Sequence, residues 1–108
     1  VKVVEGWTFR KCEALTYVEC SKLEVIGYGS FFGCTSLNGI NLPSAKFVGG
    51  FAFCGCKALR DAMFSSKLEK FGWGVFKGCK SLERITIPLK DGMIIAPDVF
   101  TKCHNLKQ

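Results

Sequence analysis

The side chains best suited to chemistry in this 108-residue chain are seven cysteines and one histidine, His104. Thiols of this kind can bind zinc, form disulfides or stay reduced in a core. Zinc requires paired ligands, and the only close pair is Cys54 and Cys56, with neither a second pair nor a nearby histidine to complete a set. An odd count argues against a disulfide framework. We therefore expect no metal, no cofactor and no structural disulfide.

Catalysis is not expected either. An enzyme needs a nucleophile or an acid–base set held in one pocket. His104 lies near the end of the chain, Asp61 and Glu83 fall at different positions of the repeat described next, and no glycine-rich phosphate loop occurs. The sequence predicts no catalytic residue and a non-enzymatic protein.

Five of the cysteines recur at intervals of 22, 22, 23 and 24 residues: Cys12, Cys34, Cys56, Cys79 and Cys103. A phenylalanine lies three positions before each of them and a leucine three positions after. The phenylalanines are Phe9, Phe31, Phe53, Phe76 and Phe100, and the leucines are Leu15, Leu37, Leu59, Leu82 and Leu106. Columns aligned in this way identify a tandem repeat. We expect residues 1–108 to form a single solenoid of four to five repeats, centred on these cysteines.

Apolar residues within a repeat are first spaced three positions apart. The spacing then falls to two positions, as from Ile40 to Leu42 and from Ile85 to Ile87. The steps of three favour a turn or a short 3₁₀ passage, and the steps of two a short strand. Pro43 and Pro88 would end that strand. The apolar residues five positions before each phenylalanine indicate a second short strand. Each unit exposes one apolar stripe, which stacking buries.

Two stretches, FFGCTSLNGINLPSAKFVGGFAF and VFKGCKSLERITIP, resemble BspA-like leucine-rich repeats, whose units are ~23 residues long. The resemblance covers residues 4–106. It implies a curved or gently twisted leucine-rich-repeat solenoid with a parallel sheet of short strands on one face and little or no long helix. It also implies a binding or adhesion surface and no catalytic residues.

Two departures from the regular unit lead to further expectations. The stretch IPLKDGMIIAPDVF is longer than its counterparts, which predicts a bulging loop between copies four and five. The repeat starts and stops mid-unit without dedicated caps. We expect a part of a longer chain, or ends that a partner covers, the alternative being frayed polar ends that are tolerated in solution.

Fifteen Lys and Arg against nine Asp and Glu give a net charge of +6. Basic residues gather in the turns on one edge, and a second group follows the strands. The first group is Arg10, Lys11, Lys57, Arg60, Lys77, Lys80, Lys102 and Lys107, and the second is Lys22, Lys46, Lys67 and Lys90. Solvated turns are the first interpretation, an acidic protein or a lipid headgroup the second, and nucleic acid the third because no recognised motif is present.

Location is only weakly indicated. No apolar run approaches the ~18 residues of a membrane span. Glu5, Arg10 and Lys11 interrupt any N-terminal signal, so we expect no signal or transit segment. Free thiols slightly favour a reducing compartment.

Candidate contact residues fall in two sets. Large aromatics precede the phenylalanine column: Trp7, Tyr28, Phe51 and Trp73. Outward strand positions supply Tyr17, Glu19, Asn41, Met63 and Arg84. We expect some of the aromatics to be exposed for protein contact, the alternative being that they fold over and cover the core. Cys54 falls in an outward column and is the candidate exposed thiol.

The sequence therefore predicts a protein-recognition or scaffold module with a protein partner, and the net charge of +6 is compatible with an acidic one. The alternative is a structural subunit permanently docked in a larger assembly.

Overall fold

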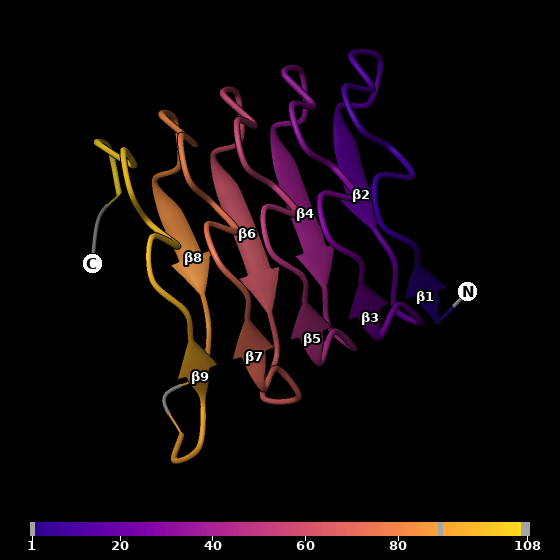
Figure 1. Ribbon diagram of the computed structural model, residues 1–108, viewed down its shortest axis with the longest axis vertical. Helices are drawn as coiled ribbons and strands as arrows, with labels where there is room; N and C mark the ends of the chain where they lie inside the picture. The colour runs from indigo at the N-terminus through magenta and orange to yellow at the C-terminus, as the bar shows by residue number, and fades with distance from the viewer. Residues whose placement is uncertain (1, 89, 107–108) are drawn as a thin grey trace.

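The computed structural model describes residues 2–88 and 90–106, which wind into a stack of coils (Figure 1). Each coil is one repeat, and we number the coils from the first, at Cys12, to the fifth, at Cys103. Two parallel sheets line the stack, with strand orders β1-β3-β5-β7-β9 and β2-β4-β6-β8. The five-stranded sheet consists of β1 (Val3–Val4), β3 (Val25–Ile26), β5 (Phe47–Val48), β7 (Lys70–Phe71) and β9 (Ile94–Ile95). The four-stranded sheet consists of β2 (Tyr17–Glu19), β4 (Gly39–Leu42), β6 (Asp61–Phe64) and β8 (Arg84–Thr86).

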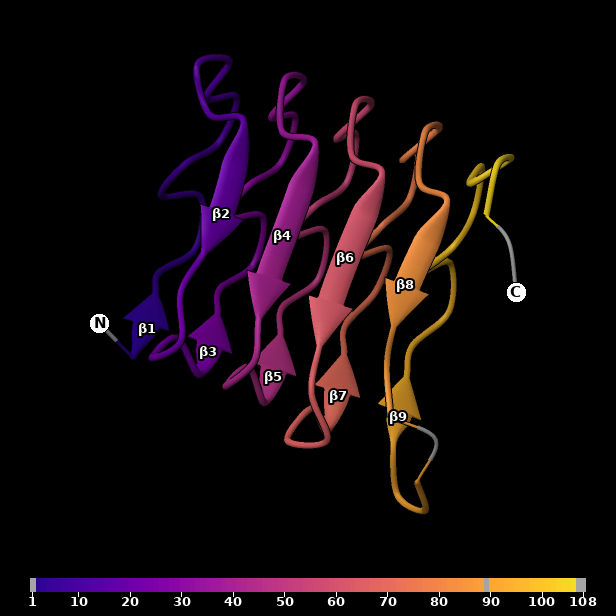
Figure 2. The same cartoon turned by 180° about the vertical axis from the view of Figure 1, so that it is seen from behind.

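The strand register follows the repeat. In the four-stranded sheet Val18 pairs with Ile40, Ile40 with Ala62, and Ala62 with Ile85. The same relation holds between successive strands of the five-stranded sheet, which lie side by side when the molecule is seen from behind (Figure 2). This confirms the expected solenoid of short parallel strands, including the second strand before each phenylalanine.

The segments between the sheets are turns. The amide of Cys34 donates to the Phe31 carbonyl and that of Leu37 to the Cys34 carbonyl, both at 3.2 Å. The Gly33 amide, directly before Cys34, donates instead to the Cys54 carbonyl of the next coil at 2.9 Å, and the Phe32 amide before it donates within its own coil to the Gly29 carbonyl at 3.1 Å. Bonds within a coil thus alternate with bonds between coils, and the described residues contain single turns and no 3₁₀ helix. Nor do they contain a helix that is long and apolar enough to cross a membrane.

Phenylalanine rings stack along the core axis. The rings of Phe9 and Phe31 lie 5.2 Å apart, and those of Phe31 and Phe53 also 5.2 Å. The stack continues to Phe76 at 5.6 Å and to Phe100 at 6.1 Å, with ring planes within 11° of parallel throughout. Each inner ring is buried on both faces by its equivalents in the neighbouring coils.

The cysteine column runs beside this stack and is joined to it. The Sγ atoms of Cys34 and Cys79 donate to the carbonyls of Phe9 and Phe53 in the preceding coils, both at 3.1 Å. Cys56 and Cys103 repeat the contact at 3.2 and 3.1 Å. The sequence predicts a small buried side chain at this column. The hydrogen bond between coils is an addition that only the structure reveals.

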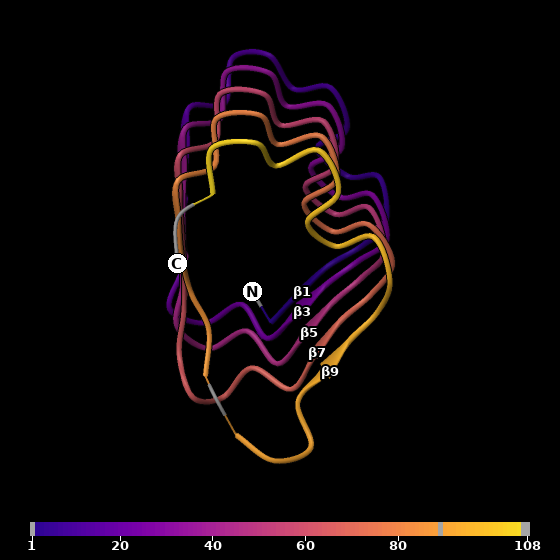
Figure 3. The ribbon, with the colours of Figure 1, turned by 90° about the vertical axis from the view of Figure 1, so that its left-hand side faces the viewer.

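The coils superpose closely down the solenoid axis except before β9, where the chain reaches further out (Figure 3). The longer spacing of the fifth repeat predicts this bulge. Lys107 of the basic edge lies outside the described residues.

Candidate functional site

The aromatic flank, which we define as Trp7, Tyr28, Phe51 and Trp73, follows the five-stranded sheet, with one residue in each of the first four coils. Trp7, Tyr28 and Trp73 are 46%, 49% and 56% exposed, and Phe51 is half-buried. The flank therefore lies on the surface, outside the stack of core phenylalanines.

Three of the four rings of the flank, Trp7, Tyr28 and Phe51, pack in a row edge to face. Trp7 and Tyr28 have ring centroids 5.3 Å apart at an interplanar angle of 64°. Tyr28 contacts Phe51 in the same way at 5.5 Å, and Trp7 contacts Phe32 at 5.8 Å. This packing holds the rings in fixed orientations while they stay accessible to solvent.

Ring and glycine alternate from coil to coil along the flank. Trp7 and Phe51 have φ angles of 63° and 58°, and the equivalent residues of the second and fourth coils, Gly29 and Gly74, have 61° and 58°. A Cβ atom at Gly29 would lie 2.4 Å from the Trp7 ring, and one at Gly74 would lie 2.7 Å from the Phe51 ring. Each ring therefore needs a glycine in the next coil, in a left-handed turn that glycine adopts without strain.

The neighbouring position shows the complementary alternation. The Tyr28 ring lies over Gly50, where an added Cβ would be 3.1 Å from the ring. The dipeptides Gly6-Trp7, Tyr28-Gly29, Gly50-Phe51 and Trp73-Gly74 carry this pattern in the sequence. Because the aromatics shift by one position between coils, a search for repeat columns reads them as irregular.

A groove with a volume of about 540 Å³ lies beside the flank. Its aromatic lining is Trp7, Tyr28, Phe32 and Phe51, and its basic lining is Lys57, Lys77, Lys80 and Lys102. We call it the flank groove. In the sequence the aromatics and the basic turns are separate features, whereas the structure brings them to one surface. It also adds Phe32, whose signal is its place in the same outward column as Cys54.

Cys54 lines the flank groove and is half-buried. Burial raises the pKa of its thiol, and the nearby charge of Lys77 offsets part of that rise. The thiolate is therefore disfavoured, and its reactivity stays a prediction. Cys12, Cys20 and Cys103 are half-buried as well, so Cys54 is not distinguished by exposure alone.

The second candidate set lies on the outer face of the four-stranded sheet. Tyr17, Glu19, Met63 and Arg84 are exposed there, and Asn41 is half-buried. Tyr17, Met63 and Arg84 line a second hollow of about 420 Å³, which shares no lining residue with the flank groove. Neither Glu19 nor Asn41 lines it.

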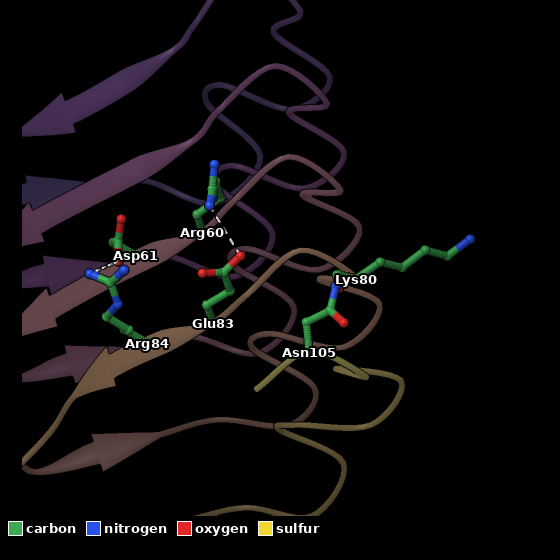
Figure 4. A network of polar contacts seen from close by, with 6 residues as sticks. All are labelled: Arg60, Asp61, Lys80, Glu83, Arg84 and Asn105. Atoms are coloured by element: carbon green, nitrogen blue, oxygen red, sulfur yellow. Dashed lines mark hydrogen bonds and ion pairs between the residues drawn. The ribbon is translucent and has the colours of Figure 1, made fainter. Parts of the chain in front are cut away.

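Charges on this sheet face are paired between coils (Figure 4). Arg84 lies 3.8 Å from Asp61, and at the adjoining turn Arg60 donates to Glu83 at 3.1 Å. These exposed pairs leave the sheet face with little net charge, so it offers less than the flank groove to a charged partner.

A third surface was missed by the sequence analysis. Val3, Phe47 and Ile94 are 50%, 42% and 55% exposed on the outer face of the five-stranded sheet. Each directly precedes an inward-facing residue of its strand, which is the signal that could have identified it.

The described residues hold no group of three or more His, Cys, Asp or Glu side chains that could bind a metal ion. His104 is exposed. All seven cysteines are free, and burial raises the pKa of Cys34, Cys56, Cys79 and Cys103. Unionised thiols in a core are poor nucleophiles.

Comparison with known proteins agrees with this architecture. A family model described as the BspA type leucine rich repeat region matches residues 1–108 in six copies. The chain belongs to the BspA-type leucine-rich repeat family. Repeats of this family are a module often used in protein interaction, and its members are generally non-enzymatic.

Solved structures of a leucine-rich repeat protein and of a pneumococcal antigen share the fold. The chain is similar to a leucine-rich repeat protein of T. pallidum, with 32% identity and a TM-score of 0.90 over 98% of this chain and 50% of that one. The pneumococcal vaccine antigen PcpA matches with 21% identity and a TM-score of 0.73 over 100% of this chain and 31% of that one. The chain thus spans about half the length of the T. pallidum protein. A comparison with curated protein sequences finds no significant match.

Proposed function

We propose that this chain is a non-enzymatic protein-recognition or scaffold module whose main contact surface is the aromatic flank. The observation that carries the proposal is the exposure of Trp7, Tyr28 and Trp73, at 46%, 49% and 56%, on successive parts of one edge. Exposed aromatics gathered on one surface are typical of protein contact sites.

The energetics favour the aromatic flank over isolated basic residues. Large aromatic side chains dominate interfaces because each buries a large area. Edge-to-face packing already restricts Trp7 and Tyr28, so they lose little conformational freedom when a partner binds. Exposed lysines gain little from single ion pairs, and salt screens them.

The test is capture of protein partners by the immobilised chain at moderate salt, read by mass spectrometry and then quantified for the partner obtained. Trp7→Gly, Phe51→Gly and Trp73→Ala should each weaken binding by about 2 kcal/mol or more where the ring is a hot spot. Reversing the charges of Lys77 and Lys80 should mainly change the association rate and the salt dependence.

Tyr17→Ala and Met63→Ala, on the sheet face, are the matched controls and should leave binding nearly unchanged. If the control variants abolish binding while the flank variants do not, the contact surface is the four-stranded sheet. If charge reversal abolishes binding and the aromatic variants bind normally, the interface is electrostatic.

A docked structural subunit is the second candidate, favoured by the exposed Val3, Phe47 and Ile94 on the five-stranded sheet. A subunit with a second apolar surface should aggregate or purify only with its assembly, whereas a recognition module should be a soluble monomer. Size-exclusion chromatography with light scattering distinguishes the two.

A further inference from the structure

The flank groove has two chemically different ends. Its aromatic lining comes from the first three coils: Trp7 from the first, Tyr28 and Phe32 from the second, and Phe51 from the third. Its lysines come from the third to the fifth coils, with Lys57 in the third, Lys77 and Lys80 in the fourth, and Lys102 in the fifth. Ring and charge are therefore separated along the solenoid axis.

The surrounding charges follow the same direction. The position directly after the column cysteine is Glu13 in the first coil and Lys57 and Lys80 in the third and fourth. At the aromatic end Arg10 lies over the Trp7 ring, 5.6 Å from its centroid, so that its charge is engaged by the ring. Among the residues that line the groove, positive charge is therefore concentrated toward the fifth coil, while Lys11 lies in the first coil outside the lining.

The lysines of the basic end have no acidic partner among the described residues. The three ion pairs among the described residues are formed by Lys46, Arg60 and Arg84, and none of them involves a groove lysine. Figure 4 shows the Lys80 side chain extended away from the coils into solvent. Among the described residues, no aspartate or glutamate lines the groove. The positive charge of the groove lysines is therefore available to an anionic ligand.

We propose that the flank groove binds an extended segment of another protein in which one or two apolar side chains adjoin a run of aspartates or glutamates. This inference rests on the proposed function and specifies the chemistry of the partner. The apolar side chains lie against Trp7, Tyr28 and Phe51, and the carboxylates face Lys57, Lys77 and Lys80.

The dimensions fit a short segment. Strands of neighbouring coils lie about 4.8 Å apart, so the four steps from the first to the fifth coil cover about 19 Å. An extended chain rises about 3.3 Å per residue, so about six residues span the groove. The expected ligand is therefore about one short linear motif long.

The separation of rings and lysines favours a peptide over nucleic acid. Each nucleotide carries both a base and a phosphate, so single-stranded sites combine stacking side chains and cations along their whole length. Here all four rings of the groove are also packed edge to face, which covers part of the surface on which bases would stack. A peptide can separate apolar from acidic residues along its length.

The test uses three end-blocked, fluorescein-labelled peptides in anisotropy titrations at low salt. The first has two leucines followed by four glutamates, the second has the same residues interleaved, and the third has glutamines in place of the glutamates. We expect the segregated peptide, in at least one of its two chain directions, to bind at least fivefold more tightly than the interleaved one and tenfold more tightly than the glutamine one.

Protein variants locate the site. Lys57→Glu with Lys80→Glu should weaken binding of the segregated peptide at least tenfold, and Trp7→Gly at least fivefold. Lys22→Glu with Lys67→Glu makes the same change in net charge in the turns that follow the strands, and should stay within twofold of the parent chain. All four lysines are exposed, and circular dichroism checks that each variant is folded. Lys57→Gln with Lys80→Gln gives a milder removal of charge with the same expected direction.

Equal binding of the segregated and interleaved peptides would overturn the inference, as would a control pair as damaging as the groove pair. Tighter binding of a single-stranded oligonucleotide or of anionic vesicles would overturn it in favour of that ligand. The proposed function fails separately. If binding of a captured partner depends on Trp7 but the segregated peptide does not displace that partner, only the inference of an acidic segment is contradicted. If no flank variant changes binding of the partner, the proposed aromatic contact surface is contradicted.

Discussion

Phe53 lies at the middle of the stack of core rings, fully buried between Phe31 and Phe76. Truncation to alanine removes the ring from both neighbours and leaves a cavity that the rigid stack fills poorly. We expect Phe53→Ala to lower the free energy of unfolding by about 3–5 kcal/mol, measured by urea denaturation. Phe9→Ala, in the same column but 40% exposed, should cost clearly less. A loss below about 1 kcal/mol for Phe53→Ala would contradict the stack as the centre of the core.

Trp7 combines a large ring with a left-handed backbone, at a φ angle of 63°. Non-glycine residues are strained in this region by about 1–2 kcal/mol, and glycine is not. Relief of this strain favours Trp7→Gly over Trp7→Ala, and the greater entropy of glycine in the unfolded chain offsets part of the gain. We therefore expect Trp7→Gly to be the more stable variant by up to about 1 kcal/mol. Thermal unfolding of the two variants measures the difference. An alanine variant at least as stable as the glycine variant would show that the turn is not strained.

At the scale of elements, the cysteine column links each coil to the one before it and also makes folding sensitive to alkali. Burial raises the pKa of Cys56 and Cys79 above the ordinary value near 9.0. Above pH 9 the unfolded chain loses these protons while the folded chain keeps them, so stability is fully present below pH 9 and falls as the pH rises. Each of these two thiols should contribute a fall that approaches about 1.4 kcal/mol per pH unit.

Urea denaturation in the presence of a reductant at pH 7.5, 8.5, 9.5 and 10 measures this dependence. The matched control is the double variant Cys56→Ala and Cys79→Ala, which should show a shallower slope above pH 9, even though it is less stable throughout. Tyrosine and lysine titrations are common to both proteins and cancel in the comparison. Parallel slopes would show that the buried thiols do not govern the alkaline loss of stability.

Sequence periodicity was sufficient to predict the strands because burial repeats with the coil. Ile40, Ala62 and Ile85 occupy one column in the sequence and pair directly in the four-stranded sheet. The same periodicity could not predict the flank groove. Which turn residues face the same side depends on left-handed backbone angles at Trp7 and Lys11, and neither residue type signals such an angle.

The site is accordingly only half predictable. The exposed aromatics follow from the fact that Phe31 and its equivalents already fill the core. The path of the turn decides whether these aromatics lie beside Lys77 and Lys80 in one groove. It also decides that Cys54 is half-buried and that Phe32 lines the groove.

For the whole molecule, thiol accessibility reports on the integrity of the stack. Without prior reduction, the denatured chain should react with a thiol reagent at all seven cysteines, because none is paired. In the native chain Cys34, Cys56 and Cys79 are buried, and we expect reaction to be confined to the half-buried thiols, which are Cys12, Cys20, Cys54 and Cys103. Mass spectrometry of the labelled peptides identifies them. Fewer than seven labels on the denatured protein would reveal disulfides and an oxidising environment.

The alternation of ring and glycine along the flank gives this surface a period of two coils, whereas the core has a period of one. A gene duplication that copied a single coil would place two rings in neighbouring copies of one position, where Trp7 and Phe51 now each face a glycine. Duplication of two coils would preserve both the core and the interlocked rings. An array of this kind should therefore lengthen in pairs of coils, and each added pair would extend the aromatic surface by two further rings.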